Sequence, residues 1–172
     1  MKERLNTLEV ALKNEMREHE FYESNAKRTR NPVGKAMFAQ IAAEELEHYE
    51  RLKQLHDKWA KEEKWPETVP LKVNDTVIGD VLKDLLQKAK EAPAGDADDL
   101  KAIRTAIEFE GNAATYYAIL RNNVTDPKEK AFFELMANIE HEHYVSLKEV
   151  EEYFIDPAAW FRRTEKTGLD GA

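Results

Sequence analysis

Two Glu-x-x-His motifs in the sequence have the residue types and spacing of a metal site. Glu45 precedes His48 in "EELEHYERLK" (44–53), and Glu140 precedes His143 in "IEHEHYVSLK" (139–148). On a helix, side chains three residues apart share one face, with Cβ atoms about 5–6 Å apart, so each pair can converge on a single point. A single motif of this kind is typical of a surface pair. Its repetition in register points instead to a shared site.

Two further glutamates extend the pattern. Glu15 and Glu110 fall in the apolar stripes of two other predicted helices, so four carboxylates and two imidazoles would point inward. An ionised carboxylate buried without a partner costs several kcal/mol, and the Lys and Arg residues fall mainly on the outward faces. Two divalent cations would balance the four carboxylates and leave both imidazoles neutral, as metal ligation requires. The sequence therefore predicts a dinuclear site, whose oxygen-rich ligands favour iron or manganese over structural zinc.

The elements that must position these residues are long helices. Charged residues make up 35% of the chain and there are only six Gly and six Pro, a composition typical of amphipathic helices. Apolar residues recur at helical spacing over about 3–29 and then up to about 63, with Asn31 and Pro32 starting the second helix. Two more helices are predicted over about 97–155, the second starting at Asp126 and Pro127.

The segment between these helix pairs interrupts the pattern. Pro and Gly residues punctuate about 64–98 around a short apolar stretch, which predicts a long crossover containing one short helix near 76–90. A tail of residues 156–172 follows the last helix, which we expect to end at Pro157. We expect Trp160 and Phe161 of this tail to dock on the same chain.

A single offset of 95 residues relates the two halves of the chain. It superposes Glu15 on Glu110 and each Glu-x-x-His motif on the other, together with many identical neighbours. Such a repeat predicts two similar helical hairpins, about 3–63 and 97–155, that bury their apolar faces against each other. The predicted fold class is therefore all-α, a four-helix bundle with one long connection, in a single domain spanning 1–172.

Several other residues have open or minor roles. Tyr22 and Tyr117 each follow the Glu of their helix by seven residues, so they either pack as core aromatics or donate hydrogen bonds to ligand carboxylates. His19, His56 and His141 fall outside the repeated set. We expect these three histidines at the surface or at the rim of the bundle.

Composition excludes several classes of function. The net charge is −8 and no basic stripe is present, so we expect no nucleic-acid partner. No apolar run is long enough to span a bilayer, and the first residues lack a signal-peptide core. The chain contains no Cys, which excludes disulfides and thiolate metal sites. We expect a soluble, cytoplasmic protein without a membrane partner.

The motifs resemble the rubrerythrin branch of the ferritin-like superfamily. They read "EMREHEFY" (15–22), "EELEH" (44–48), "EFEGNAATYY" (108–117) and "IEHEH" (139–143). The resemblance implies a ferritin-like bundle with a di-iron centre, in which manganese or zinc could substitute for iron. The metal ligands that it implies are Glu15, Glu45, His48, Glu110, Glu140 and His143, with Glu45 and Glu140 as bridges. It further implies reduction of hydrogen peroxide or dioxygen with electrons from a rubredoxin-type donor.

The chain departs from the family pattern at two points. It has no Cys and hence no rubredoxin-type iron centre of its own, so the electron donor, such as rubredoxin, would be a separate protein. Related proteins carry an additional ligand Glu where this chain has Ala113, and the repeat counterpart of Ala113 is Glu18. Glu18 is either a further metal ligand or a solvated side chain. We expect the solvated alternative.

These features lead to three hypotheses for function. The first is a non-haem di-iron oxidoreductase of the rubrerythrin type, a peroxidase that works as a homodimer or higher homo-oligomer. The second is a ferroxidase that stores iron as ferritins do, which would require a large hollow assembly. The third is a structural bundle whose site has lost its activity.

Overall fold

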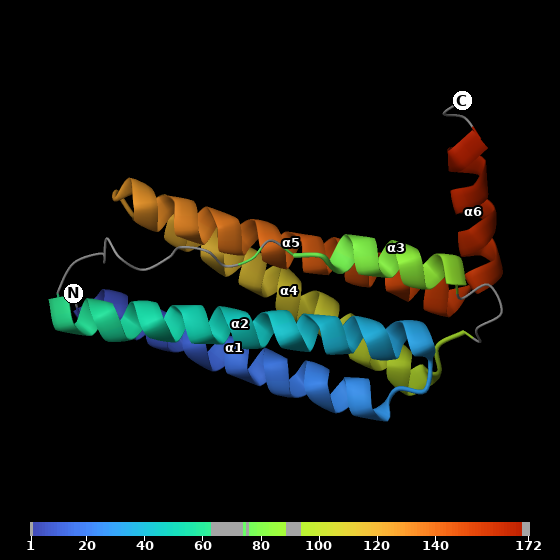
Figure 1. Ribbon diagram of the computed structural model, residues 1–172, viewed down its shortest axis with the longest axis horizontal. Helices are drawn as coiled ribbons and strands as arrows, with labels where there is room; N and C mark the ends of the chain where they lie inside the picture. Colours follow the sequence, from blue (N-terminus) through green and yellow to red (C-terminus); the bar gives the residue numbers. More distant parts are fainter. Residues whose placement is uncertain (1, 63–73, 75, 89–93, 170–172) are drawn as a thin grey trace.

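The protein is a bundle of long helices. The computed structural model describes residues 2–62, 74, 76–88 and 94–169, with side chains for 5–61, 74, 76–85 and 94–163. The described residues form helices and no strand: α1 (Lys2–Arg28), α2 (Pro32–Glu62), α3 (Ile78–Lys88), α4 (Ala97–Asn123), α5 (Pro127–Ile155) and α6 (Pro157–Leu169). The four long helices run side by side, with α3 along one side and α6 turned across one end (Figure 1). The predicted all-α ferritin-like fold class is confirmed.

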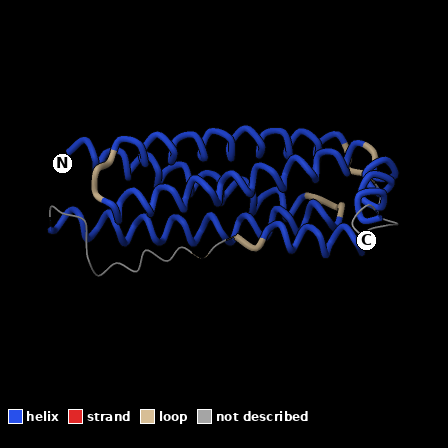
Figure 2. Tube along the Cα trace, turned by 90° about the horizontal axis from the view of Figure 1, so that it is seen from above, coloured by secondary structure: helices blue, strands red, loops and turns tan. Residues whose placement is uncertain are grey.

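Two helical hairpins build the bundle. Helix α1 packs along α2, and α4 packs along α5. Figure 2 shows the four long helices as one elongated layer-on-layer arrangement, with the tight turns of both hairpins at the bundle ends. Among the described helices, none has a stretch that is both long and apolar enough to cross a lipid bilayer.

The predicted helix starts are confirmed by their caps. Asn31 Oδ1 accepts hydrogen bonds from the backbone N–H of Val33 and of Gly34, at 2.9 and 3.1 Å. Asp126 caps α5 in the same way, with a proline at the first helical position. A further cap was not predicted: Asp96 and Asp99 form a capping box at the start of α4. Buried Asp99 also accepts a hydrogen bond from Thr29 Oγ1, at 3.0 Å, so the end of α1 is tied to the start of α4.

The buried apolar side chains form two clusters, one toward each end of the bundle. The first contains Tyr22, Ala26, Val33, Met37, Phe38, Ile41, Ala42, Ile78, Leu82, Ala102, Ile103, Ala106, Leu147, Val150, Tyr153 and Phe154. The second contains Leu8, Ala11, Leu52, Leu55, Trp59, Tyr117, Phe132, Phe133, Met136, Ala137 and Ile139. Along each long helix, the buried Glu15, Glu18, Glu45, His48, Glu110, Glu140 and His143 lie between the two clusters. Water is therefore excluded from that polar layer by apolar packing on both sides.

The predicted short helix of the crossover is present as α3. It packs against both α2 and α5, and its apolar side chains Ile78 and Leu82 are buried in the first cluster. Thr76 Oγ1 accepts a hydrogen bond from the backbone N–H of Ile78, at 3.1 Å, as expected for a helix start. The rest of the predicted crossover, over 63–73, 75 and 89–93, lies outside the described residues.

The tail forms a helix that the sequence reading did not predict. Pro157 ends α5 but occupies the first position of α6, where a missing N–H costs nothing. Asp156 Oδ1 accepts a hydrogen bond from Ala159 N, at 2.9 Å. Trp160 Nε1 donates to Glu149 Oε2, at 2.8 Å, and Trp160 and Phe161 both pack edge-on against Tyr153. Docking of the tail aromatics on their own chain is confirmed.

Close packing at Gly34 gives a stability prediction. A Cβ at position 34 would lie 2.6 Å from Cζ of the buried Phe154 ring and 3.0 Å from Cγ2 of Thr29. We therefore expect Gly34→Ala to lower the free energy of unfolding by about 1–3 kcal/mol, as overpacking does. The control is Gly79→Ala in α3, where a Cβ meets nothing within 4 Å and helix propensity should add up to about 1 kcal/mol. Chemical denaturation of both variants would measure this, and equal stabilities would contradict the packing.

Candidate metal centre

The six predicted ligands converge at the middle of the bundle. All are buried, with exposed fractions of 1% or less. They form two groups whose potential ligand atoms lie within 4.8 Å of one another. One group is Glu15, Glu45, His48 and Glu140; the other is Glu45, Glu110, Glu140 and His143. Each group therefore draws on three helices, and Glu45 and Glu140 belong to both.

The first group is arranged around the imidazole of His48. Its Nδ1 lies 3.2 Å from Glu15 Oε2, 3.2 Å from Glu45 Oε2 and 3.5 Å from Glu140 Oε1. The Glu-x-x-His spacing places Glu45 one helical turn from His48, as expected for side chains on one face. Three carboxylate oxygens and one nitrogen thus face a common point.

The second group repeats this arrangement around His143. Its Nδ1 lies 3.2 Å from Glu45 Oε1, 3.4 Å from Glu110 Oε2 and 3.6 Å from Glu140 Oε2. Glu45 and Glu140 therefore each direct one carboxylate oxygen to the His48 side and the other to the His143 side. The two imidazole rings are nearly parallel, with centroids 6.0 Å apart. This is the geometry of two adjacent cation positions that share two carboxylates.

The two tyrosines hold the remaining carboxylates from across the bundle. The hydroxyl of Tyr117 on α4 donates to Glu15 Oε1 on α1, and the hydroxyl of Tyr22 on α1 donates to Glu110 Oε1 on α4. In both glutamates the other oxygen, Oε2, faces the imidazole of its group. The alternative left open by the sequence is thereby decided, because both tyrosines are core aromatics whose hydroxyls orient a centre carboxylate.

Glu44 is a residue of this site that the sequence reading missed. Its Oε2 lies 2.7 Å from Nε2 of His143, the ring nitrogen that points away from the centre. Gln40 Nε2 donates to Glu44 Oε1 at 2.7 Å, and the side chain of Thr76 also bonds to this carboxylate. Although burial opposes ionisation, these partners lower the pKa of Glu44 to about 2. The repeat is the sequence signal that could have pointed to Glu44, because the equivalent position in the second half holds the apolar Ile139.

Glu18 is not the solvated side chain that was expected. It is 2% exposed, because it lies one turn beyond Glu15 on the inward face of α1. Its Oε1 accepts a hydrogen bond from Arg17, at 3.1 Å, while its buried Oε2 has no partner among the described residues. Burial, and then repulsion by Glu45 and Glu140, raises the pKa of Glu18 to about 8.

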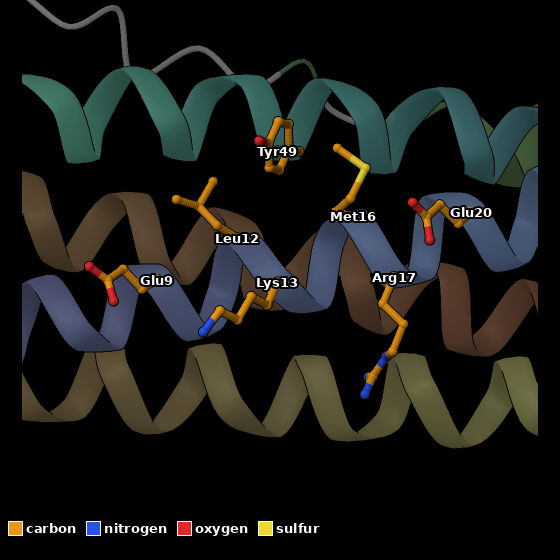
Figure 3. Close-up of a pocket in the computed structure, with 7 residues that line it drawn as sticks. All are labelled: Glu9, Leu12, Lys13, Met16, Arg17, Glu20 and Tyr49. Carbon is orange, nitrogen blue, oxygen red and sulfur yellow. The ribbon is translucent and has the colours of Figure 1, made fainter.

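Arg17 links Glu18 to the protein surface. The Arg17 side chain is 59% exposed and its guanidinium also lies over the Phe109 ring, 4.8 Å from the centroid. Arg17 lines a shallow surface groove of about 440 Å³ beside Met16 and Tyr49, in which its side chain extends away from α2 (Figure 3). The ion pair therefore connects one buried carboxylate, Glu18, to an exposed side chain that lines the groove.

In the metal-free centre, the buried carboxylates outnumber the neighbouring groups that can carry positive charge. Burial, and then repulsion by Glu140, raises the pKa of Glu15, and burial raises that of Glu110 despite His143. The pKa of Glu45 and of Glu140 is lowered, because the neighbouring imidazoles outweigh burial. The imidazoles of both histidines have raised pKa values: burial opposes their charge, but the surrounding carboxylates outweigh it. Without metal, protons must therefore supply the missing positive charge.

Unpartnered atoms show that cations fit this centre. The buried side-chain atoms without a hydrogen-bond partner at the centre are Glu15 Oε2, Glu45 Oε1, Glu110 Oε2, Glu140 Oε1, Glu140 Oε2 and His143 Nδ1. These atoms face inward, and buried polar atoms without partners are rare in folded proteins. Carboxylate oxygens with one imidazole nitrogen on each side are ligands that suit divalent iron or manganese.

The three remaining histidines lie away from the centre, as expected. His19 is half-buried between α1 and α2, where its Nδ1 lies 2.7 Å from the carbonyl oxygen of Ala42. His56 is half-buried near Glu9, and His141 is exposed. None of the three belongs to the two groups of potential ligands found among the described residues.

The raised pKa values predict that the metal-free protein loses stability as pH rises. His48 and His143 have folded pKa values above the unfolded 6.5, so their contribution is present below 6.5 and lost through the folded pKa. The burial penalty on Glu18 grows from about pH 4.5 to about 8. Carboxylates with lowered pKa values, such as Glu44, already contribute fully above about 4.5.

We therefore expect the melting temperature of the metal-free protein to fall as pH rises from 5 to 9. Each unit by which a pKa differs between the folded and unfolded states changes the free energy of unfolding by about 1.4 kcal/mol. Glu18→Gln should flatten this profile, because an amide does not titrate. Metal loading should flatten it too and release protons into an unbuffered solution. A stability that stays level or increases with pH would contradict the electrostatics.

Comparison with known proteins identifies a family for this chain. The family model described as Rubrerythrin matches residues 6–151, which include all six converging ligands and both tyrosines. Searches of curated proteins and of solved structures found no match. The match covers both hairpins and most of the chain, and the site has the acid and imidazole groups that a di-iron centre requires. This chain belongs to the rubrerythrin family.

Proposed function

We propose that the protein is a non-haem di-iron oxidoreductase that reduces hydrogen peroxide, or dioxygen, with electrons from a separate donor. One observation carries the proposal: Glu45 and Glu140 each present one oxygen to each of two adjacent groups, and each group adds its own Glu and His. Two ions held by these residues would be close enough to supply electrons to one small oxidant. Membership of the rubrerythrin family supports the choice of iron.

In this proposal each side chain has a defined ligand role. Glu15 and His48 would hold one ion, and Glu110 and His143 the other, with Glu45 and Glu140 bridging them. When bound there, two ferrous ions would supply the two electrons that, with two protons, convert hydrogen peroxide into two water molecules. Manganese or zinc could occupy the same ligands, but zinc cannot change its oxidation state.

The protein itself orients the ligand carboxylates, excludes bulk water from them and adds a further negative charge beside them. Tyr22 and Tyr117 hold the carboxylates of Glu110 and Glu15, respectively, so that one oxygen of each faces inward. The apolar clusters on both sides keep bulk water from the carboxylates. Glu18 adds a fifth inward carboxylate beside them, and we propose it as an additional ligand, with Arg17 as its partner on the surface side.

Re-reduction of the centre would need a partner. The chain contains no Cys, so it has no rubredoxin-type iron site, and we propose a separate rubredoxin-like donor. We further propose a homodimer or small homo-oligomer as the working form. Hydrodynamic mass tests this second point, and a large hollow cage would instead favour iron storage.

The shared carboxylates give a prediction about metal stoichiometry. We expect Glu45→Ala or Glu140→Ala to weaken both metal positions, so that neither variant retains two ions per chain after gel filtration. His48→Ala should lose only one. The matched controls are Glu47→Ala and Glu142→Ala, which lie on the same two helices at equivalent positions of the repeat and outside both ligand groups. Two ions retained by Glu45→Ala would refute the ligand assignment.

Rapid mixing distinguishes the proposed reaction from its rivals. Protein loaded anaerobically with two ferrous ions should be oxidised within seconds by one equivalent of hydrogen peroxide, as followed by absorption, and then turn over with reduced rubredoxin. Preferential reaction with dioxygen, followed by uptake of many further iron ions, would indicate a ferroxidase. Two bound irons that respond to neither oxidant would eliminate the oxidoreductase.

A further inference from the structure

Glu44 breaks the near-symmetry of the centre. The offset of 95 residues pairs each of the six converging ligands with the same residue type in the other half and pairs Tyr22 with Tyr117, whereas Glu18 is paired with Ala113. Glu44 is paired with Ile139, which is fully buried in the second apolar cluster. Whatever Glu44 does for the centre is therefore done on one side only.

The contact of Glu44 is with His143, on the side away from the metal positions. Its Oε2 lies 2.7 Å from Nε2 of His143, and the His143 side chain is fully buried. An ionised carboxylate can only accept a hydrogen bond, so the proton of this pair lies on Nε2. When a bound cation keeps the imidazole neutral, this contact would fix the tautomer whose Nδ1 lone pair faces the position between Glu45, Glu110 and Glu140.

Glu44 is itself fixed in place by two elements. Gln40, one turn earlier on α2, donates to its Oε1 at 2.7 Å, and Thr76 at the start of α3 contributes a side-chain hydrogen bond. The Glu44 side chain is only 13% exposed. His143 is therefore oriented by a carboxylate that has little freedom to move.

His48 has no equivalent support among the described residues. Its charged neighbours among the described residues, Glu15, Glu45 and Glu140, all lie at Nδ1 and belong to the centre. Hydrogen bonds from a carboxylate to the outer nitrogen of a ligating imidazole fix its orientation and raise its basicity, and their loss typically costs 10–100-fold in metal affinity.

We propose that Glu44 makes the two metal positions inequivalent, so that the position formed by Glu110 and His143 binds its divalent cation more tightly than the position formed by Glu15 and His48. This inference rests on the metal centre of the proposed function but not on its reaction. Glu44 is a positioning residue in this scheme, because it acts through His143 and faces away from the ions.

Single-site variants test the proposal without any assay of activity. His48→Ala keeps the position of Glu110 and His143, and His143→Ala keeps the position of Glu15 and His48. Anaerobic calorimetric titration of each metal-free variant with Co²⁺ should give the tighter Kd for His48→Ala. Adding Glu44→Ala should raise that Kd about 10–100-fold. Adding Glu44→Ala to His143→Ala should leave its Kd unchanged, because the side chain that Glu44 orients is then absent.

The control and the decisive outcomes follow from the same geometry. Glu47→Ala removes a carboxylate one turn along α2 that bonds to Asn74 and touches no proposed ligand, so it should change neither Kd. Glu44→Gln keeps the shape of the side chain and one acceptor oxygen. It should weaken metal binding at the His143 position by less than Glu44→Ala does, and it replaces that variant if the alanine variant fails to fold.

Equal Kd values for the two single-site variants, or an equal effect of Glu44→Ala on both, would overturn the proposal. Absence of Co²⁺ binding to the unsubstituted protein would refute the metal centre itself, whereas normal binding without redox chemistry would refute only the oxidoreductase.

Discussion

The structure depends on compensating five carboxylates that are buried in one dry layer. Glu15, Glu18, Glu45, Glu110 and Glu140 are at most 2% exposed, and apolar clusters close the layer on either side. Removing such charges from water is costly unless positive charge enters with them. The described residues offer one nearby cation, the largely exposed guanidinium of Arg17, and two imidazoles. Bound cations or protons must complete the balance, so the stability of this fold and the occupancy of its centre are linked.

The surrounding layer converts a cluster of acids into an ordered site. In Glu15 and in Glu110, one carboxylate oxygen accepts a hydrogen bond from a tyrosine of the opposite hairpin, and the other oxygen is directed inward. The tyrosines thus join α1 and α4 across the centre. On the opposite side of the bundle, Glu44 joins α2 to α5 through His143, and Thr76 extends this contact to α3. The polar network therefore contributes to the alignment of the hairpins as well as to the geometry of the site.

Much of this arrangement was predictable from sequence because helical periodicity and the repeat constrain the same residues. The inward faces of Glu15, Glu45 and their counterparts follow from spacing alone. Spacing could also have placed Glu18 inside, since it lies three residues after Glu15. The partners of Glu44 could not be predicted, because they depend on how far α2 and α5 are shifted along each other. Helix α6 was missed because proline both ends one helix and can begin the next.

The presence of Glu18 and Glu44 in only one of the two halves makes the hairpins chemically distinct. A symmetric pair of first hairpins would bring two copies of Glu18 into the interior and increase its acid excess. A symmetric pair of second hairpins would contain Ala113 and Ile139 twice, and neither imidazole would have a carboxylate behind it. Linking both halves in one polypeptide permits each of these residues to occur once. The covalent connection therefore allows an asymmetric metal centre, which symmetric self-association of one hairpin could not produce.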